Sequence, residues 1–101
     1  MGLALKKIGK IEEAIDCYRK AVDIDPKYAY AYYNLGLALD DTNKLDEAID
    51  CYRKAIEINP KFVDAYVNLG SALYDTNKLN EAIDCYRKAI EISGNLYVKM
   101  C

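Results

Sequence analysis

The sequence predicts an all-α chain built as an α-solenoid, in which antiparallel helix pairs stack through a 34-residue repeat. The segment at residues 47–58 returns in nearly the same form from Glu13 and again from Glu81. The offset between copies is 34 positions in both steps, as the cysteines show: Cys17, Cys51 and Cys85. A period of this size is typical of stacked repeat arrays, so each unit is expected to bury its apolar side against its neighbours.

The composition fits a soluble helical globule. The chain has 101 residues, of which 52% are hydrophobic and 30% charged, and its formal net charge is -2. This charge leaves no excess of Lys and Arg to neutralise a run of phosphates, so we expect no nucleic-acid partner. No apolar run approaches the roughly 20 residues of a membrane span, and the N-terminus lacks the features of a signal peptide. We therefore expect a cytoplasmic or otherwise intracellular protein without a membrane partner.

Turn residues and helical periodicity predict where the helices begin and end. In the first unit, Gly9 is expected to break the chain before a helix at residues 11–24. Asn43 and Asn77 take the same place in later units, and Gly and Asn both tolerate the left-handed conformation that closes a helix. Pro26 and Pro60 separate the units, because proline disfavours helical geometry in the residue before it. The remaining helices are expected at residues 28–41, 45–58, 62–75 and 79–92.

The repeat boundaries predict one array with unfinished ends. Residues 1–28 are expected to form a truncated first repeat, 29–62 the second and 63–96 the third, with 97–101 beginning a cut-off fourth helix pair. Uncovered apolar surface at both ends predicts self-association. We expect end-to-end stacking, in which the tail of one copy begins a helix that the N-terminus of the next copy resumes.

The middle unit carries an ordered set of motif residues: Tyr32, Leu35, Gly36, Leu39, Ala48, Tyr52, Ala55 and Pro60. This set resembles the tetratricopeptide repeat, with Tyr in place of the usual Trp, and the resemblance covers essentially the whole chain. Gly94 stands where the other units have proline. The resemblance implies a right-handed superhelix in which the first helix of each repeat lines a concave groove that binds a protein or peptide segment.

The expected binding residues lie on the helices at 28–41 and 62–75, opposite their packing sides. They are Tyr30, Tyr33, Asn34, Leu37, Asp41, Asp64, Val67, Asn68, Ser71, Tyr74 and Asp75. Such a mixture suits an extended peptide, including one that carries Lys or Arg. The acidic residues supply the charge, and the tyrosines supply contact area at low entropy cost.

Two asparagines one repeat apart, Asn34 and Asn68, predict a ladder along the groove. A carboxamide has both donors and an acceptor, so it can hold a peptide main chain independently of its side chains. The arrangement is similar to the asparagine ladder in the repeat arm of O-linked N-acetylglucosamine transferases. The alternative is that Asn is simply frequent before Leu-Gly in this family. The carboxylate clamp of other members fits less well, because Asp64 and Asn68 stand where Lys and Arg are expected.

No constellation for catalysis is present in the sequence. There is no His, nucleophile elbow or glycine-rich phosphate loop,. Asp40, Asp41 and Asp75 could form paired carboxylates, but they stand beside predicted turns and are interpreted as solvated. The repeated cysteines are interpreted as free thiols, and without His or Cys-x-x-Cys spacing no metal or cofactor is expected.

We therefore predict a non-catalytic interaction module that binds an extended peptide or partner segment. The main alternative is the substrate-recruiting arm of a larger enzyme, such as a glycosyltransferase. A purely architectural repeat that assembles with itself is the third possibility.

Overall fold

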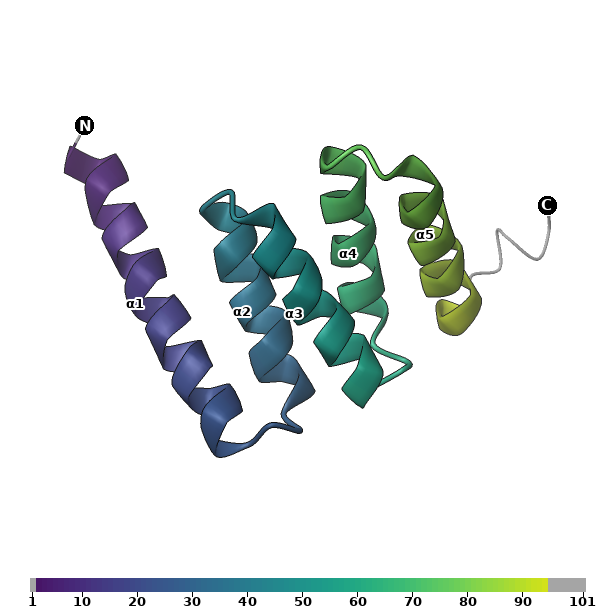
Figure 1. The fold of residues 1–101 in the computed structure, drawn as a ribbon, viewed down its shortest axis with the longest axis horizontal. Helices are drawn as coiled ribbons and strands as arrows, with labels where there is room; N and C mark the ends of the chain where they lie inside the picture. The colour runs from purple at the N-terminus through teal and green to yellow at the C-terminus, as the bar shows by residue number, and fades with distance from the viewer. Residues whose placement is uncertain (1, 95–101) are drawn as a thin grey trace.

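The computed structural model describes the backbone of residues 2–94 and the side chains of residues 9–94. Within that part of the chain, five helices and no strand are present. Figure 1 shows the helices side by side in a row, each turning back to the next, with the first and last helices at opposite ends. The all-α solenoid predicted from the repeat is thus confirmed. The helices are α1 (Gly2–Ile24), α2 (Ala29–Asp41), α3 (Leu45–Ile58), α4 (Val63–Asp75) and α5 (Leu79–Ser93).

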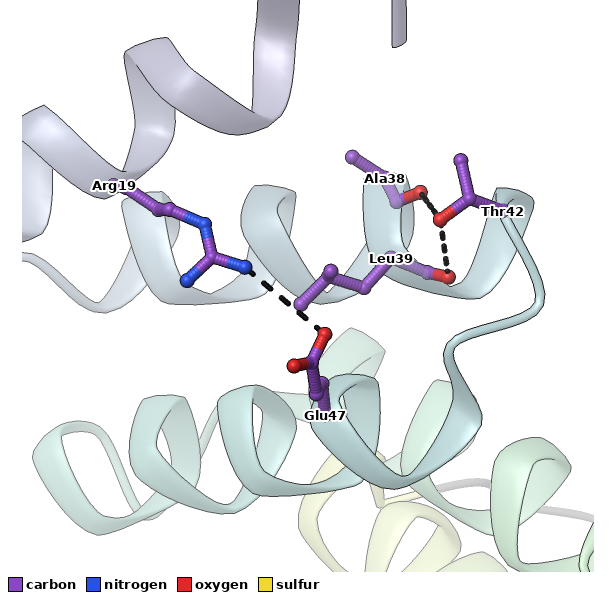
Figure 2. Close-up of polar contacts among 5 residues, drawn as sticks. All are labelled: Arg19, Ala38, Leu39, Thr42 and Glu47. Atoms are coloured by element: carbon purple, nitrogen blue, oxygen red, sulfur yellow. Dashed lines mark hydrogen bonds and ion pairs between the residues drawn. The ribbon is translucent and has the colours of Figure 1, made fainter. Parts of the chain in front are cut away.

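A threonine and an asparagine together end the first helix of each complete pair. The Thr42 hydroxyl donates to the carbonyls of Ala38 and Leu39, at 3.3 and 3.0 Å (Figure 2). Asn43 then adopts a left-handed φ of 62°, and the backbone N–H of Lys44 donates to Leu39. This pattern satisfies carbonyls that the helix end would leave unpaired. The same geometry recurs at residues 76–78, so the predicted role of both asparagines is confirmed.

The predicted break at Gly9 is wrong, because α1 runs through it without interruption from Gly2 to Ile24. The reason lies in the local sequence: Ile8 occupies the place of Thr42 and has no hydroxyl with which to stop a helix. Glycine accepts helical as well as left-handed geometry, so it does not force a turn. The first unit therefore contributes one long helix where a helix-turn-helix had been predicted.

Tight turns built on proline separate α1 from α2 and α3 from α4. Asp25 accepts a hydrogen bond on its side chain from the backbone N–H of Lys27, and Asn59 accepts one from Lys61. Proline at the second turn position supplies the required φ, while an Asx side chain closes the turn. The helix boundaries that depend on these turns were predicted within one residue.

The core within the middle pair explains the motif residues. Ala48, Tyr52 and Ala55 on α3 have 0% exposure. A Cβ added to Gly36 would lie 2.6 Å from the Tyr52 ring, so only glycine lets α2 approach this closely,. Gly70 meets the Tyr86 ring in the same way, at 2.9 Å. The Leu-Gly and aromatic motif positions are thus the two sides of one helix contact.

The second helix of each repeat, α1, α3 or α5, carries an equivalent isoleucine whose burial depends on the next unit. Ile15 on α1 is 3% exposed and Ile49 on α3 is 5% exposed, whereas Ile83 on α5 is 47% exposed. α5 ends at Gly94, which is left-handed at φ 66° and donates to the Ile90 carbonyl. The predicted start of a fourth unit at 97–101 lies outside the described residues.

The repeated cysteines are free thiols in the structure, as predicted. Burial raises the pKa of Cys51 to about 11 and also raises that of Cys85, so both thiols stay protonated at neutral pH,. None of the described helices combines the length and the apolar character that crossing a membrane would need.

Candidate peptide-binding face

The predicted binding residues on α2 and α4 are spaced three or four positions apart, so on each helix they share one side. We call this surface the α2–α4 face. On α2 it comprises Tyr30, Tyr33, Asn34, Leu37 and Asp41, and on α4 it comprises Asp64, Val67, Asn68, Ser71, Tyr74 and Asp75. The two helices contact each other directly, which brings both groups to the same part of the molecule.

One side-chain hydrogen bond joins the two helices across this face. The Asn68 Nδ2 group donates to the Tyr33 hydroxyl at 2.9 Å and to the backbone carbonyl of Asp64, also at 2.9 Å. Because a carbonyl can only accept a hydrogen bond, the contact with the Asp64 carbonyl shows that the Nδ2 group, not Oδ1, faces these partners,. The Asn68 Oδ1 atom consequently faces away from these partners.

Tyr33 lies at the centre of an aromatic cluster that holds its ring in place. Its centroid is 4.9 Å from that of Phe62, 6.0 Å from that of Tyr52 and 6.3 Å from that of Tyr30. Tyr30 also packs against Phe62 at 5.0 Å while remaining 57% exposed. Contacts of this kind add stability beyond the burial of area, so the Tyr33 hydroxyl is held on a rigid support.

The environment of Tyr33 favours its neutral phenol. Burial of the ring raises its pKa, and the nearby carboxylate of Asp64 raises it further, while the bond from Asn68 lowers it. The hydroxyl therefore keeps its proton at neutral pH and can donate it.

A second group lies at the C-terminal ends of α2 and α4. The Tyr52 hydroxyl donates to Asp40 at 3.4 Å. Burial raises the pKa of Asp40, the bond from Tyr52 lowers it, and the carboxylates of Asp41 and Asp75 raise it. Burial also raises the pKa of Tyr52, with Asp40 adding to the effect. Asp40 is thus partly desolvated, although it had been interpreted as a solvated turn residue.

The other predicted residues differ in their surroundings. Ser71 lies 3.1 Å from the Tyr86 hydroxyl, and Leu37 packs against the core, so both are partly structural. Tyr74 is 63% exposed and Val67 is 40% exposed. Asn34 is partly buried and forms no side-chain hydrogen bond with another described residue. The two asparagines of the predicted ladder therefore have different environments.

Sequence reasoning missed three contributors to this face. Phe62 packs against Tyr30 and Tyr33. The Tyr52 hydroxyl is bonded to Asp40 on α2, and the Tyr86 hydroxyl is bonded to Ser71 on α4. Phe62 could have been found from its alignment with Tyr28, since both aromatics follow the turn proline by two positions. Within residues 9–94, no group of His, Cys, Asp and Glu side chains could hold a metal ion.

Comparison with known families agrees with the fold. A family model described as "TPR repeat" matches residues 2–40, and one described as "Tetratricopeptide repeat" matches residues 29–62 and 63–100. The chain belongs to the tetratricopeptide repeat family. No curated protein matches it.

Solved structures of this family are similar to the chain over most of its length. Two crystal structures of MamA share 36% identity with it, with TM-scores of 0.83 and 0.80, and the match covers 92% of this chain. It covers 54% and 51% of the MamA chains, so the chain spans about half their length. The first TPR of Spaghetti (RPAP3), bound to the HSP90 peptide SRMEEVD, shares 33% identity at a TM-score of 0.83. That match covers 93% of this chain and 75% of the other.

Proposed function

We propose that the chain is a non-catalytic interaction module that binds an extended protein segment on the α2–α4 face. The observation that carries this proposal is the bond between Asn68 and Tyr33, which unites two helices into one polar and aromatic surface. The peptide complex of the similar RPAP3 structure supports a peptide as the class of ligand. Rigid aromatic rings beside polar groups are typical of surfaces that bind protein segments.

The charge of the face favours a segment that carries Lys or Arg. Four charged residues lie on α2 and α4, all of them aspartates: Asp40, Asp41, Asp64 and Asp75. Neither helix contains Lys or Arg, whereas α3 and α5 carry both signs. The HSP90 peptide bound by RPAP3 contains three acidic residues and one Arg. A peptide of that charge would be repelled here, so we propose a ligand of opposite sign.

Binding to the α2–α4 face can be tested with a random dodecapeptide library displayed on phage. The strongest selected peptide is then measured by calorimetry against the parent protein and the Asn34→Ala/Asn68→Ala double variant. Each lost hydrogen bond should weaken binding by about 0.5 to 1.5 kcal/mol while helicity is unchanged. Asn80→Ala on α5, outside the face, is the matched control. Unchanged affinity in the double variant would contradict the proposal.

A larger enzyme could use the same face to recruit its substrate, and a glycosyltransferase arm is one such arrangement. The face would then act as described, with the chemistry in another domain. A catalytic domain encoded after Cys101 in the full-length gene would favour this form of the proposal.

Self-association through α5 is a second candidate, favoured by the exposure of Ile83, because its equivalents Ile15 and Ile49 are buried by the following helices. Ion pairs repeat across the same junctions: Arg19 with Glu47 at 4.0 Å (Figure 2), and Arg53 with Glu81 at 3.9 Å. If the arrays stack end to end, the next pair in this series would join Arg87 of one copy to Glu13 of the following copy. Exposed pairs add at most about 1 kcal/mol, so the apolar contact would dominate.

Light scattering across a concentration series tests this second candidate. Ile83→Asp should lower the average mass at high concentration, because it places a charge in the apolar contact. Ile24→Asp changes an isoleucine of α1 that is 85% exposed, and it serves as the control. A parent protein that stays monomeric at high concentration would exclude the stacking.

A further inference from the structure

Helix α5 carries an apolar stripe that α4 covers only in part. Its residues follow one another in steps of four, three and four positions: Leu79, Ile83, Tyr86 and Ile90. This spacing keeps them on one side of the helix over a length of about 16 Å. Leu79 is 46% exposed and Ile83 is 47% exposed, and α5 lies at the end of the row of helices (Figure 1). We call this surface the α5 stripe.

The two flanks of the α5 stripe differ in character. On one flank Ala82 and Ala89 are 1% and 4% exposed, because α5 packs on α4 there. The other flank consists of exposed polar residues: Asn80, Asp84, Arg87 and Glu91. A partner of the α5 stripe therefore meets α4 along one flank and charges of both signs along the other.

The N-terminal end of a second copy does not offer the helix that covers the equivalent stripe on α3. There Ile49 is buried under α4, which is the first helix of the next repeat. In the N-terminal unit, residues 2–24 form the single helix α1, so the described residues contain no separate first helix at that end. End-to-end stacking therefore does not repeat the contact between α3 and α4.

We propose that the α5 stripe binds the α5 stripe of a second copy, with the two helices antiparallel about a two-fold axis. Ile83 then faces the partner's Tyr86, and Leu79 faces the partner's Ile90, so each apolar residue of the stripe meets another. The exposed flanks meet each other, and α4 lies on the same side in both copies, as in a four-helix bundle. A parallel pair is excluded, because it would place the exposed flank of one copy against α4 of the other.

The charges on the exposed flank fit the antiparallel register. Arg87 lies about 3 Å along the helix axis from the partner's Asp84. The two-fold axis repeats this pair, so each dimer contains it twice. The equivalents of Arg87 on α1 and α3 each pair with a glutamate of the next unit, whereas Arg87 has no carboxylate partner within residues 9–94. This inference rests on the second candidate function, self-association through α5, and names the surface that α5 meets.

Light scattering of the full chain over a concentration series tests the two-fold pair, with a reducing agent present to keep the thiols free. The average mass should level off at twice the 11.4 kDa of one chain. Ile83→Asp should weaken the dimer by about tenfold or more, because it places a charge in the apolar contact. Ile24→Asp, on α1, should leave the mass unchanged. Circular dichroism should show the same helicity for both variants, so that a loss of association is not a loss of fold.

Charge reversals separate the two-fold pair from end-to-end stacking. Arg87→Asp should weaken the dimer about tenfold, because it brings like charges together twice, and adding Asp84→Arg should restore it. In a stack Arg87 would instead lie near Glu13 of the next copy, so Glu13→Arg would be the change that restores association. That result, or a mass that grows beyond the dimer, would overturn the two-fold pair while self-association through α5 stands. A mass that stays monomeric would overturn both and leave the proposed peptide binding on the α2–α4 face unaffected.

Discussion

The repeats at residues 29–62 and 63–94 are built from nearly the same motif residues, yet their outer helices have different surroundings. On α3, Ile49 is 5% exposed and Tyr52 is 0% exposed, whereas on α5 Ile83 is 47% exposed and Tyr86 is only partly buried. The local sequence is nearly the same, with Asp46 on α3 aligned to Asn80 on α5, and α4 covers α3 while no described helix follows α5. Burial in this array is therefore a property of the junction rather than of the residue.

The first helices of the two repeats, α2 and α4, show the reverse: each lies between two described helices, but some of their residues differ. In the second repeat the Tyr52 hydroxyl donates to Asp40, and in the third repeat the Tyr86 hydroxyl is bonded to Ser71. Tyr33 and Leu37 in the second repeat become Val67 and Ser71 in the third. The buried motif residues of the first helices are copied between the two repeats, while these partly exposed positions have diverged.

The largest expected effect compares the two isoleucines. Ile49→Ala should destabilise the fold by about 3 kcal/mol, because it leaves a cavity between packed helices. Ile83→Ala should cost less than about 1 kcal/mol, since its side chain is already half in water. Denaturant unfolding followed by circular dichroism measures both, and equal losses would contradict the difference in burial.

The next comparison uses the two motif glycines. Gly36→Ala should cost about 1 to 3 kcal/mol, because the added methyl would overlap the Tyr52 ring, which is fully buried,. Gly70→Ala should cost less, because Tyr86 is partly exposed and can shift away. Thermal unfolding of the two variants ranks them, and a greater loss for Gly70→Ala would reverse the argument.

The first unit can be compared with the others at Gly9. Gly9→Ala should stabilise the chain by about 0.5 to 1 kcal/mol, because the site is an open position inside a continuous helix,. Asn43 is the repeat equivalent of Gly9 but has a left-handed φ. Asn43→Ala should therefore destabilise the chain by about 1 kcal/mol,. If both alanines destabilise the protein, residues 2–24 do not form one helix in solution.

The smallest effect concerns the pH dependence of Asp40, which Tyr74 replaces in the next repeat. Its pKa is raised in the folded chain, so the protonated form contributes stability that is complete below its ordinary pKa and is lost as the pH rises through the raised value,. Asp40→Asn should therefore be more stable than the parent at pH 7, by about 0.5 kcal/mol after screening by water, and no more stable at pH 3. Asp50→Asn on α3 controls for the change in net charge. Urea unfolding at the two pH values measures the difference, and an advantage that is larger at pH 3 would contradict the sign.

Local chemistry explains why most of the fold could be predicted. The period of 34 defined the repeat, and the proline turns and asparagine caps predicted the helix ends within one residue, as with Leu45–Ile58. The turn and cap signals each act over a few positions of the chain. Gly9 failed as a signal because glycine permits either a turn or a helix, and the threonine that precedes Asn43 and Asn77 is absent before it,.

By itself, the sequence determined the family, the two helix pairs of residues 29–94 and the side of each helix that carries the candidate site, because repeat period and helical periodicity are properties of the chain in one dimension. Only the tertiary structure decided that Asn68 bonds to Tyr33, 35 positions away, that Phe62 supports that tyrosine, and that Asp40 loses part of its water. These features depend on how two helices from different repeats are placed against each other. A repeat copied in sequence predicts equivalent asparagines, and the contact between α2 and α4 makes them different.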